Sequence, residues 1–454
     1  MYRLDVFGEP VTLPDRASVE AWNAAALAFL EHAEATPTHL ARLLDHVPLH
    51  AGSLALKGLL LALLARRETM EMAEGALRAA REGRCDANGR ELALVAALAR
   101  VLAGEPRAAI EAIEAVLAKA PGDTLLVKLS HSLLFLLGDG AGMRRSVERA
   151  LPAHDHDHPG RGYLLGCHAF ALEETGAYRE AHARGSEALA LEPRDAWGLH
   201  AVTHVYDMTG DALGGLRWLD GREAAWQHCN NFRFHVWWHR ALMLLDLGRL
   251  DEALRLYDDA IRSERTDDYR DIANATSLLA RLQLEGIDVG RRWDELADLA
   301  ERRTGDGCLL FADLHYLLAL TNARRPAAEA VLIARIERDG VSPRTGTARR
   351  MARPGVDVAH ALAAFGRGDY ARAFRRFSAA RSDIRDMGGS HAQRDVFDRL
   401  TIEAGLRSGN LVGAAAVLDD RSRRRGRHVD GFAASRRRRI ADAAKRPCLS
   451  ASGA

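Results

Sequence analysis

Cysteine is scarce in this 454-residue chain. The five cysteines are Cys85, Cys167, Cys229, Cys308 and Cys448, an odd total with no CxxC pair. A secreted disulfide framework would need an even, closely spaced set, and a thiolate zinc site would need paired cysteines. The cysteine pattern therefore indicates neither, and it favours a reducing compartment.

Long apolar runs are also missing. The longest, Leu54 to Ala65, covers about twelve residues and includes Lys57, whereas a membrane span needs about 20. The first residues, MYRLDVFGEP, show no basic segment followed by an apolar one, as a signal peptide would. We therefore expect a cytoplasmic protein with no membrane partner.

Strand-forming runs of Val, Ile and Thr are few, and proline numbers only 13. Alanine, leucine and arginine are common instead, which favours helices over sheets. The chain also lacks GxxxxGK[ST], GxSxG, HExxH and a GxGxxG that follows a strand. These absences argue against P-loop, α/β-hydrolase, zincin and dinucleotide-binding enzymes.

The formal net charge is only +1, which gives no reason to expect nucleic acid on the body of the protein. The total conceals a split, because residues 421–454 contain eleven Lys/Arg and two Asp, a net charge of +9, and residues 1–420 carry −8. A basic run of this kind can bind an anionic partner. More often it is a solvated end, so we expect 421–454 to be a disordered tail.

A repeat is the strongest structural signal. Turn glycines at 104, 138, 176, 210 and 248 are separated by 34, 38, 34 and 38 residues. This spacing is typical of tetratricopeptide repeats, which are paired antiparallel helices of about 34 residues. The clearest copy reads GAYREAHARGSEALALEP (176–193), with small alanines for close packing and a final proline. The prediction is an all-α tetratricopeptide-type solenoid over 18–420, preceded by an N-terminal segment, 1–17.

Histidines fall in a pattern on two consecutive predicted A helices. DAWGLHAVTHVYDMTG carries His200 and His204, and NNFRFHVWWHRALMLLDLG carries His235 and His239. Each pair is spaced i,i+4, so both imidazoles project from one helix face. The repeat register places three of the four toward the concave groove.

The two pairs admit three interpretations. They could hold a divalent transition metal, act as a general acid and base or as binders of an anionic ligand, or serve structure among Trp197, Trp237 and Trp238. Convergence of three or more imidazole nitrogens on one point would favour the metal. Asp207 and Asp313 are carboxylates that could complete a site.

Other candidates are weaker. His131 falls at a helix-packing position, so we expect it to be buried and hydrogen-bonded. The run HDHDH (154–158) precedes Pro159 and Gly160, which predicts a solvated turn. Asp313 and His315, two residues apart on a helix, should point in different directions. Ser390 and Gln393 fit a helix capping box.

Several segments together resemble the tetratricopeptide repeat protein 38 family, over about residues 20–420. They are KLSH (128–131), DAWGLHAVTHVYDM (195–208), HVWWHRAL (235–242), RLQLEGIDVGRRW (281–293), FADLH (311–315) and GGSHAQRDVF (388–397). The resemblance implies the same helical solenoid and carries over to His131, His200, His204, His235, His239, Asp313, His315, Gln393, Arg394 and Asp395. His391 and Asp207 depart from the family pattern, which has Asn and Glu there.

From these patterns we expect a tetratricopeptide protein that binds a partner protein or a small ligand in a His- and Trp-rich concave groove. The groove residues would be His131, His200, His204, His235, Trp238, His239, Asp313, His315, Arg394 and Asp395. The alternative is an enzyme whose active site uses the groove histidines, with a divalent metal held by His200, His204, His235 and His239.

Overall fold

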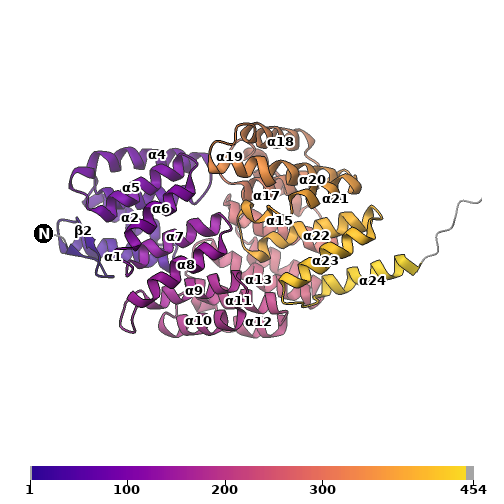
Figure 1. Ribbon diagram of the computed structural model, residues 1–454, viewed down its shortest axis with the longest axis horizontal. Helices are drawn as coiled ribbons and strands as arrows, with labels where there is room; N and C mark the ends of the chain where they lie inside the picture. The colour runs from indigo at the N-terminus through magenta and orange to yellow at the C-terminus, as the bar shows by residue number, and fades with distance from the viewer. Residues whose placement is uncertain (1–2, 446–454) are drawn as a thin grey trace, which may run out of the picture.

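The computed structural model describes residues 3–445 and consists almost entirely of antiparallel helix pairs (Figure 1). The first half contains α1 (Arg16–Leu30), α2 (Thr36–His46), α3 (Ala51–Ala62), α4 (Arg67–Glu82), α5 (Gly89–Leu102), α6 (Pro106–Leu117), α7 (Thr124–Leu136), α8 (Gly140–Ala150), α9 (Arg161–Glu174), α10 (Tyr178–Leu191), α11 (Ala196–Thr209) and α12 (Ala212–Leu219).

The second half continues the pairing. It contains α13 (Phe232–Asp246), α14 (Leu250–Leu256), α15 (Tyr269–Leu284), α16 (Arg292–Arg302), α17 (Leu310–Asn322), α18 (Pro326–Gly340), α19 (Gly346–Arg350), α20 (Val356–Gly366), α21 (Tyr370–Ala380), α22 (His391–Arg407), α23 (Leu411–Arg424) and α24 (Gly431–Lys445). The predicted all-α tetratricopeptide-type solenoid is confirmed.

The repeat glycines end the A helices as predicted. Gly104, Gly138, Gly176, Gly210 and Gly248 all have φ between 66° and 85°, in the left-handed region. At Gly248 the glycine N–H donates to the Leu245 carbonyl, and the next N–H donates to the Leu244 carbonyl. These two bonds satisfy the last carbonyls of α13 and reverse the chain into α14.

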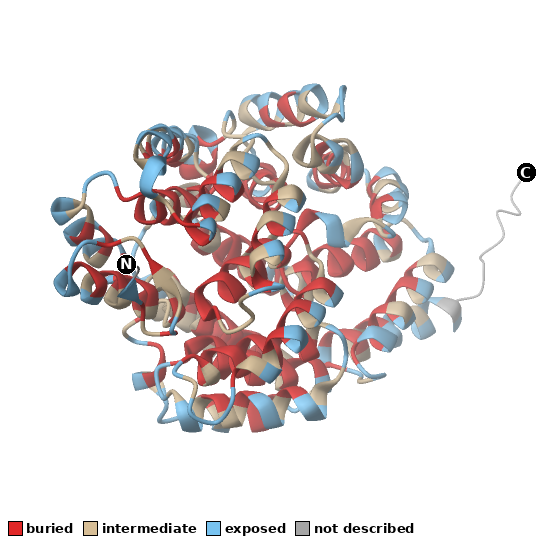
Figure 2. Cartoon of the chain, turned by 60° about the vertical axis from the view of Figure 1, so that its left-hand side comes forward, coloured by how far each residue is buried: buried red, intermediate tan, exposed pale blue. Residues whose placement is uncertain are grey.

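The two helices of a pair differ in their surroundings. The A helices α9, α11 and α17 are buried on nearly every side, whereas the B helices α10 and α21 bury only one stripe. Figure 2 shows the buried helices at the centre and the exposed faces outside. A helix without a polar face must be covered on all sides, so the A helices form the inner wall of the superhelix.

The superhelix closes on itself. The Gly104 carbonyl, after α5, accepts a hydrogen bond from the backbone N–H of Thr347 in α19 at 3.2 Å. Glu68 of α4 pairs with Arg303 at 2.7 Å, and a β-bridge joins Ala33 to Cys229. These contacts link segments about 200 or more residues apart, so the concave side becomes an interior.

The N-terminal segment packs onto the solenoid. Two short strands, β1 (Arg3–Leu4) and β2 (Pro10–Val11), form an antiparallel pair that the sequence did not predict. Phe7, Val11 and Leu13 are buried in the core of the first helices. The Thr12 hydroxyl donates to Glu91 of α5 at 2.7 Å, so this segment covers the end of the solenoid.

The prediction of a disordered tail from residue 421 is wrong for 421–445. α23 continues to Arg424, and α24 follows as a packed helix. Arg421, Arg425 and Arg436 are buried and pair with carboxylates of the helical body. The acidic body supplies partners for these arginines, and this long-range pairing is invisible in a local charge run. The part of the prediction that concerns 446–454 lies outside the described residues.

Among residues 3–445, no helix combines the length and the apolar character needed to cross a bilayer.

Candidate functional site

The four predicted histidines converge. Nε2 of His200 lies 3.0 Å from Nε2 of His204, 3.0 Å from Nε2 of His235 and 3.1 Å from Nε2 of His239. The Nε2 atoms of His235 and His239 are 3.2 Å apart. One nitrogen from each of four buried imidazoles thus faces a common point.

These contacts cannot all be hydrogen bonds. Each Nε2 presents either one proton or one lone pair, and the three nitrogens of His200, His235 and His239 are mutually in contact. At least two of the three must be in the same state and therefore repel each other. A cation at the centre removes the conflict. Four nitrogens around a tetrahedral metal with bonds of 2.0–2.1 Å lie about 3.4 Å apart, close to the observed spacing.

The repeat produces this cluster from two helices. His200 and His204 face inward from α11, and His235 and His239 face inward from α13, the neighbouring A helix. The sequence register predicted three inward histidines, and the structure brings all four together. The fourth histidine faces inward although the repeat register differs between α11 and α13.

Burial keeps the four imidazoles neutral. It lowers the pKa of His204 to about 4 and that of His235 to about 3. Burial and, secondarily, the neighbouring histidines hold the pKa values of His200 and His239 well below the usual range. A neutral imidazole is the form that ligates a metal, so these four side chains need not lose a proton at neutral pH before binding one.

Outside the cluster, one hydrogen bond orients the His235 ring, and a carboxyl group lies close to the His204 ring without a hydrogen bond to it. Asn274 Oδ1 of α15 accepts a hydrogen bond from His235 Nδ1 at 2.9 Å, which leaves a lone pair on the inward Nε2. Glu173 Oε2 of α9 lies 3.5 Å from His204 Nδ1. An outer partner such as Asn274 fixes the tautomer of a metal-binding histidine.

The carboxylate beside His204 was missed in the sequence. Asp207 was the predicted candidate, but Arg425 binds it at 3.2 Å. Glu173, at the end of α9, takes that place, and burial, reinforced by the charges of Glu174 and Asp207, raises its pKa well above the usual range. Glutamates near a helix C-terminus carry no local signal for this role, since the contact with His204 depends on packing between repeats.

The cluster lies beside a large cavity. The cavity has a volume of about 730 Å³, and His200 and His235, one ligand from each helix, are among the residues that line it. Trp197 and Phe232 line it next to them, as does Lys128 of α7. A metal held by the four histidines would therefore be close to a chamber large enough for a small molecule.

Two further predicted groove residues support the cluster from behind. Trp238 is fully buried, donates from Nε1 to Ser277 Oγ at 3.1 Å and stacks on His235 with ring centroids 5.2 Å apart. His131 is buried as expected, and its Nε2 accepts a hydrogen bond from Trp197 Nε1 at 3.2 Å. Neither residue lines the cavity. The expectation that Trp238 and His131 contact a ligand in the groove is therefore wrong, and both side chains pack against other aromatic rings.

Four other predicted groove residues, Asp313, His315, Arg394 and Asp395, also lie outside the lining of the 730 Å³ cavity. Asp313 pairs with Arg335 at 2.5 Å, and His315 Nδ1 bonds the Phe311 carbonyl at 2.7 Å, so the two do not pair with each other, as predicted. Their burial within α17 explains why neither reaches the cavity.

Arg394 and Asp395 are engaged in structure. Arg394 bonds the Gly389 carbonyl and pairs with Glu174 at 3.3 Å, while Asp395 pairs with Arg399 and Arg421. The predicted capping box of Ser390 and Gln393 is present at the start of α22. Ser390 and Gln393 themselves line the cavity.

The HDHDH turn is only partly solvated. His156 is exposed, but His154 is fully buried, with Nε2 2.9 Å from the Thr124 hydroxyl and Nδ1 3.0 Å from the Ala150 carbonyl. The prediction of a solvated turn is therefore wrong at His154, because the turn folds back onto α7.

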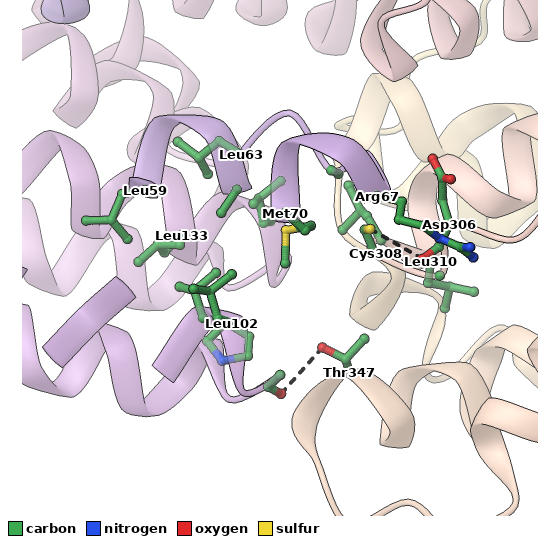
Figure 3. A pocket seen from close by; sticks show the side chains of 18 of the residues that line it. Leu59, Leu63, Arg67, Met70, Leu102, Leu133, Asp306, Cys308, Leu310 and Thr347 are labelled. Carbon is green, nitrogen blue, oxygen red and sulfur yellow. Dashed lines mark hydrogen bonds between the residues drawn. The ribbon is translucent and has the colours of Figure 1, made fainter. Parts of the chain in front are cut away.

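A second cavity of about 430 Å³ lies where the superhelix closes (Figure 3). Leu59, Leu63 and Leu102 line one side, and Cys308 and Leu310 line the other. The Thr347 hydroxyl spans its edge with a 3.4 Å hydrogen bond to the Gly104 carbonyl. Its lining is chiefly aliphatic and includes none of the clustered histidines, so the chemistry concentrates in the larger cavity.

No protein-family model matches the sequence. Among solved structures, the chain is similar to one titled "Structure of Naa15/Naa10 bound to HypK-THB", with a TM-score of 0.25 and 15% sequence identity. The match covers 90% of this chain and 64% of that chain, so this chain spans less than two thirds of its length. A likeness at this level gives no grounds for assigning a function.

Proposed function

We propose that this protein binds one divalent transition metal through His200, His204, His235 and His239. The observation that carries the proposal is the convergence of four Nε2 atoms, with spacings of 3.0 to 3.2 Å around His200. Imidazole ligands suit Zn²⁺, Cu²⁺, Ni²⁺ and Fe²⁺, while Mg²⁺ and Ca²⁺ prefer oxygen. Among these metals we favour Zn²⁺, because four neutral nitrogens in a compact cluster match its tetrahedral preference.

We also propose that the chain is a member of the tetratricopeptide repeat protein 38 family. The segments that carry the resemblance include the two histidine helices, DAWGLHAVTHVYDM and HVWWHRAL. These helices form the centre of the site, which supports reading the resemblance as a shared site as well as a shared fold.

The ligand that we propose for the concave side is a small molecule in the 730 Å³ cavity. Contacts such as Gly104 to Thr347 close the superhelix, so the histidines lie beside a cavity with walls from both halves of the chain. His235 is 9% exposed and His200 is 2% exposed, which suits contact with a small group better than with a folded surface.

A metal-dependent enzyme is the second candidate. It is favoured by one observation: two of the four ligands, His200 and His235, line the cavity. If the metal has an open coordination position on that side, it can polarise a bound substrate as a Lewis acid. A metal closed off by four ligands would be structural.

The metal proposal is tested by elemental analysis of the purified protein and of a His204→Ala/His239→Ala variant. We expect about one transition metal per wild-type chain and none in the variant. His46 and His156 are exposed, so His46→Ala/His156→Ala is the matched control and should keep the metal. Wild-type protein that contains no metal, and takes up none after incubation with Zn²⁺, would refute the proposal.

Cobalt substitution separates the two candidates. The visible spectrum of Co²⁺-loaded protein reports four-coordinate geometry, and added azide probes an open position. A spectrum altered by azide supports the enzyme, whereas an unaltered spectrum supports a closed, structural metal. Circular dichroism of each variant checks that the helices are intact.

A further inference from the structure

Lys128 is a buried cation that lacks a counter-ion. Its residue is only 3% exposed, and among the described residues no carboxylate lies within 4.0 Å of its ammonium group. Its described interaction is with the indole of Trp197, where Nζ lies 4.5 Å from the ring centroid. Lys128 lines the cavity without a carboxylate partner, and the low-dielectric surroundings of a largely buried side chain strengthen its attraction for an anion.

The nearest candidate inside the protein is a poor partner. Asp195, at the start of α11, is fully buried and interacts with Lys128 only beyond ion-pair distance. Burial raises the pKa of Asp195 to about 7, so its carboxyl group is ionised in only part of the molecules at neutral pH. It therefore leaves the ammonium of Lys128 largely uncompensated.

Lys128 differs in this from the other cations around the cavity. Arg270 is held by Asp268 through two bonds of 2.8 and 2.6 Å. Arg66 lies 3.6 Å from Glu68, and Lys57 is exposed to water. The positive charge that remains for a ligand is thus concentrated at Lys128.

The remaining wall near Lys128 is aromatic and aliphatic. Phe135 and Phe232 line the cavity together with Leu60 and Leu61. The Trp197 ring centroid is 5.0 Å from that of His200, so a single indole separates the ammonium from the histidine cluster. A molecule of modest length could span the distance between them.

We propose that the 730 Å³ cavity binds an organic anion, with its carboxylate, sulfonate or phosphate on Lys128 and its aromatic or aliphatic body against Trp197 and Phe232. This orientation directs the far end of the molecule toward His200 and His235. The inference deepens the proposed function, and only that last feature rests on the metal.

The test uses two fluorescent probes that differ only in charge. 1-Anilinonaphthalene-8-sulfonate carries a sulfonate, and N-phenyl-1-naphthylamine is the same fluorophore without it. Both are titrated into wild type, Lys128→Met and Lys57→Met, with and without one equivalent of Zn²⁺. Lys57→Met is the matched control, because Lys57 lines the same cavity but is exposed.

We expect the sulfonate probe to bind wild type and Lys57→Met equally, and Lys128→Met at least tenfold more weakly. The neutral probe should bind all three alike and displace the sulfonate probe from wild type, which shows that the two share the cavity. Equal sulfonate affinity in wild type and Lys128→Met overturns the inference, as does failure of the sulfonate probe to bind wild type. If Lys128-dependent binding persists in protein that takes up no metal, the anion site stands and the metal proposal falls.

Discussion

Arg421 offers a direct test of whether the C-terminal helices belong to the folded body. Its Nε donates to Asp395 Oδ1 at 2.5 Å, and its Nη2 donates to Asp395 Oδ2 at 3.0 Å and to Asp430 Oδ2 at 2.6 Å. The residue is 1% exposed. The substitution Arg421→Met keeps much of the side-chain volume and removes all three bonds.

The cost follows from the carboxylate that stays behind. Arg421 and, after it, Arg399 hold the pKa of Asp395 well below its usual range against the opposing effect of burial, so the change takes the strongest partner from a buried carboxylate and leaves Arg399 as its close partner. Removing one member of a buried ion pair costs about 3–5 kcal/mol. Arg423, two residues away, forms an exposed pair with Asp420 at 3.2 Å, and Arg423→Met should cost less than about 1 kcal/mol.

Urea unfolding followed by circular dichroism measures both variants. We expect Arg421→Met to be less stable than Arg423→Met by roughly 3 kcal/mol. In the double variant Asp395→Asn/Arg421→Met, the loss should be smaller than the sum of the two single losses, because the orphaned charge is gone. Equal stability of Arg421→Met and Arg423→Met would show that residues from 421 onward are not packed, and the reasoning would fail.

Three further predictions follow from other parts of the chain. Glu173→Leu should weaken metal binding by about 10- to 100-fold, because it removes the carboxyl group that faces His204 Nδ1; a competition titration with a chelator measures this, and unchanged affinity would contradict the assigned role. Acid should destabilise the protein through His154, because burial lowers the pKa of its imidazole to about 4. The unfolded state therefore binds the proton first as the pH falls. The contribution of His154 to the free energy of unfolding is complete above pH 6.5 and decreases toward pH 4, by about 2 kcal/mol at pH 5. His154→Asn should lose that much less between pH 7 and pH 5 in urea titrations. Gly248→Ala, at φ 72°, should lower the free energy of unfolding by about 1 kcal/mol, whereas Gly75→Ala inside α4 should raise it by up to about 1 kcal/mol. Urea unfolding measures both, and a change of the same sign in the two variants would contradict the left-handed turn at Gly248.

The repeat could be predicted from the sequence because its determinants are local. A turn glycine such as Gly176, together with the alanines that follow it, specifies a helix pair within about 34 residues. The N-terminal strands and the packed C-terminal helices could not be predicted in this way. Val11 is buried by the first helices, and Arg421 is paired with Asp395 of the preceding helix. The residues next to Val11 and Arg421 in the sequence therefore do not indicate that either side chain is buried.

The histidine cluster was predicted in outline because it uses only neighbouring repeats. His200 and His239 belong to successive A helices, and the period alone brings such helices side by side. The residues around the cluster depend on longer-range packing. Glu173 reaches His204 from the preceding repeat, and Arg394 was assigned to the groove, although it pairs with Glu174.

The same distinction explains why Lys128 was overlooked in favour of His131, three residues further along α7. A lysine on a helix is ordinarily a solvated residue, whereas Lys128 is buried and packs against Trp197 of α11. Contacts such as Glu68 with Arg303 turn the open groove of a repeat array into a chamber. The histidine cluster is thus built by neighbouring repeats, whereas the cavity proposed for the anion has walls from both halves of the chain. Arg303→Met leaves Asp267, in the cavity wall, without its cation, so it should weaken binding of the sulfonate probe while leaving the bound metal content of the histidine cluster unchanged.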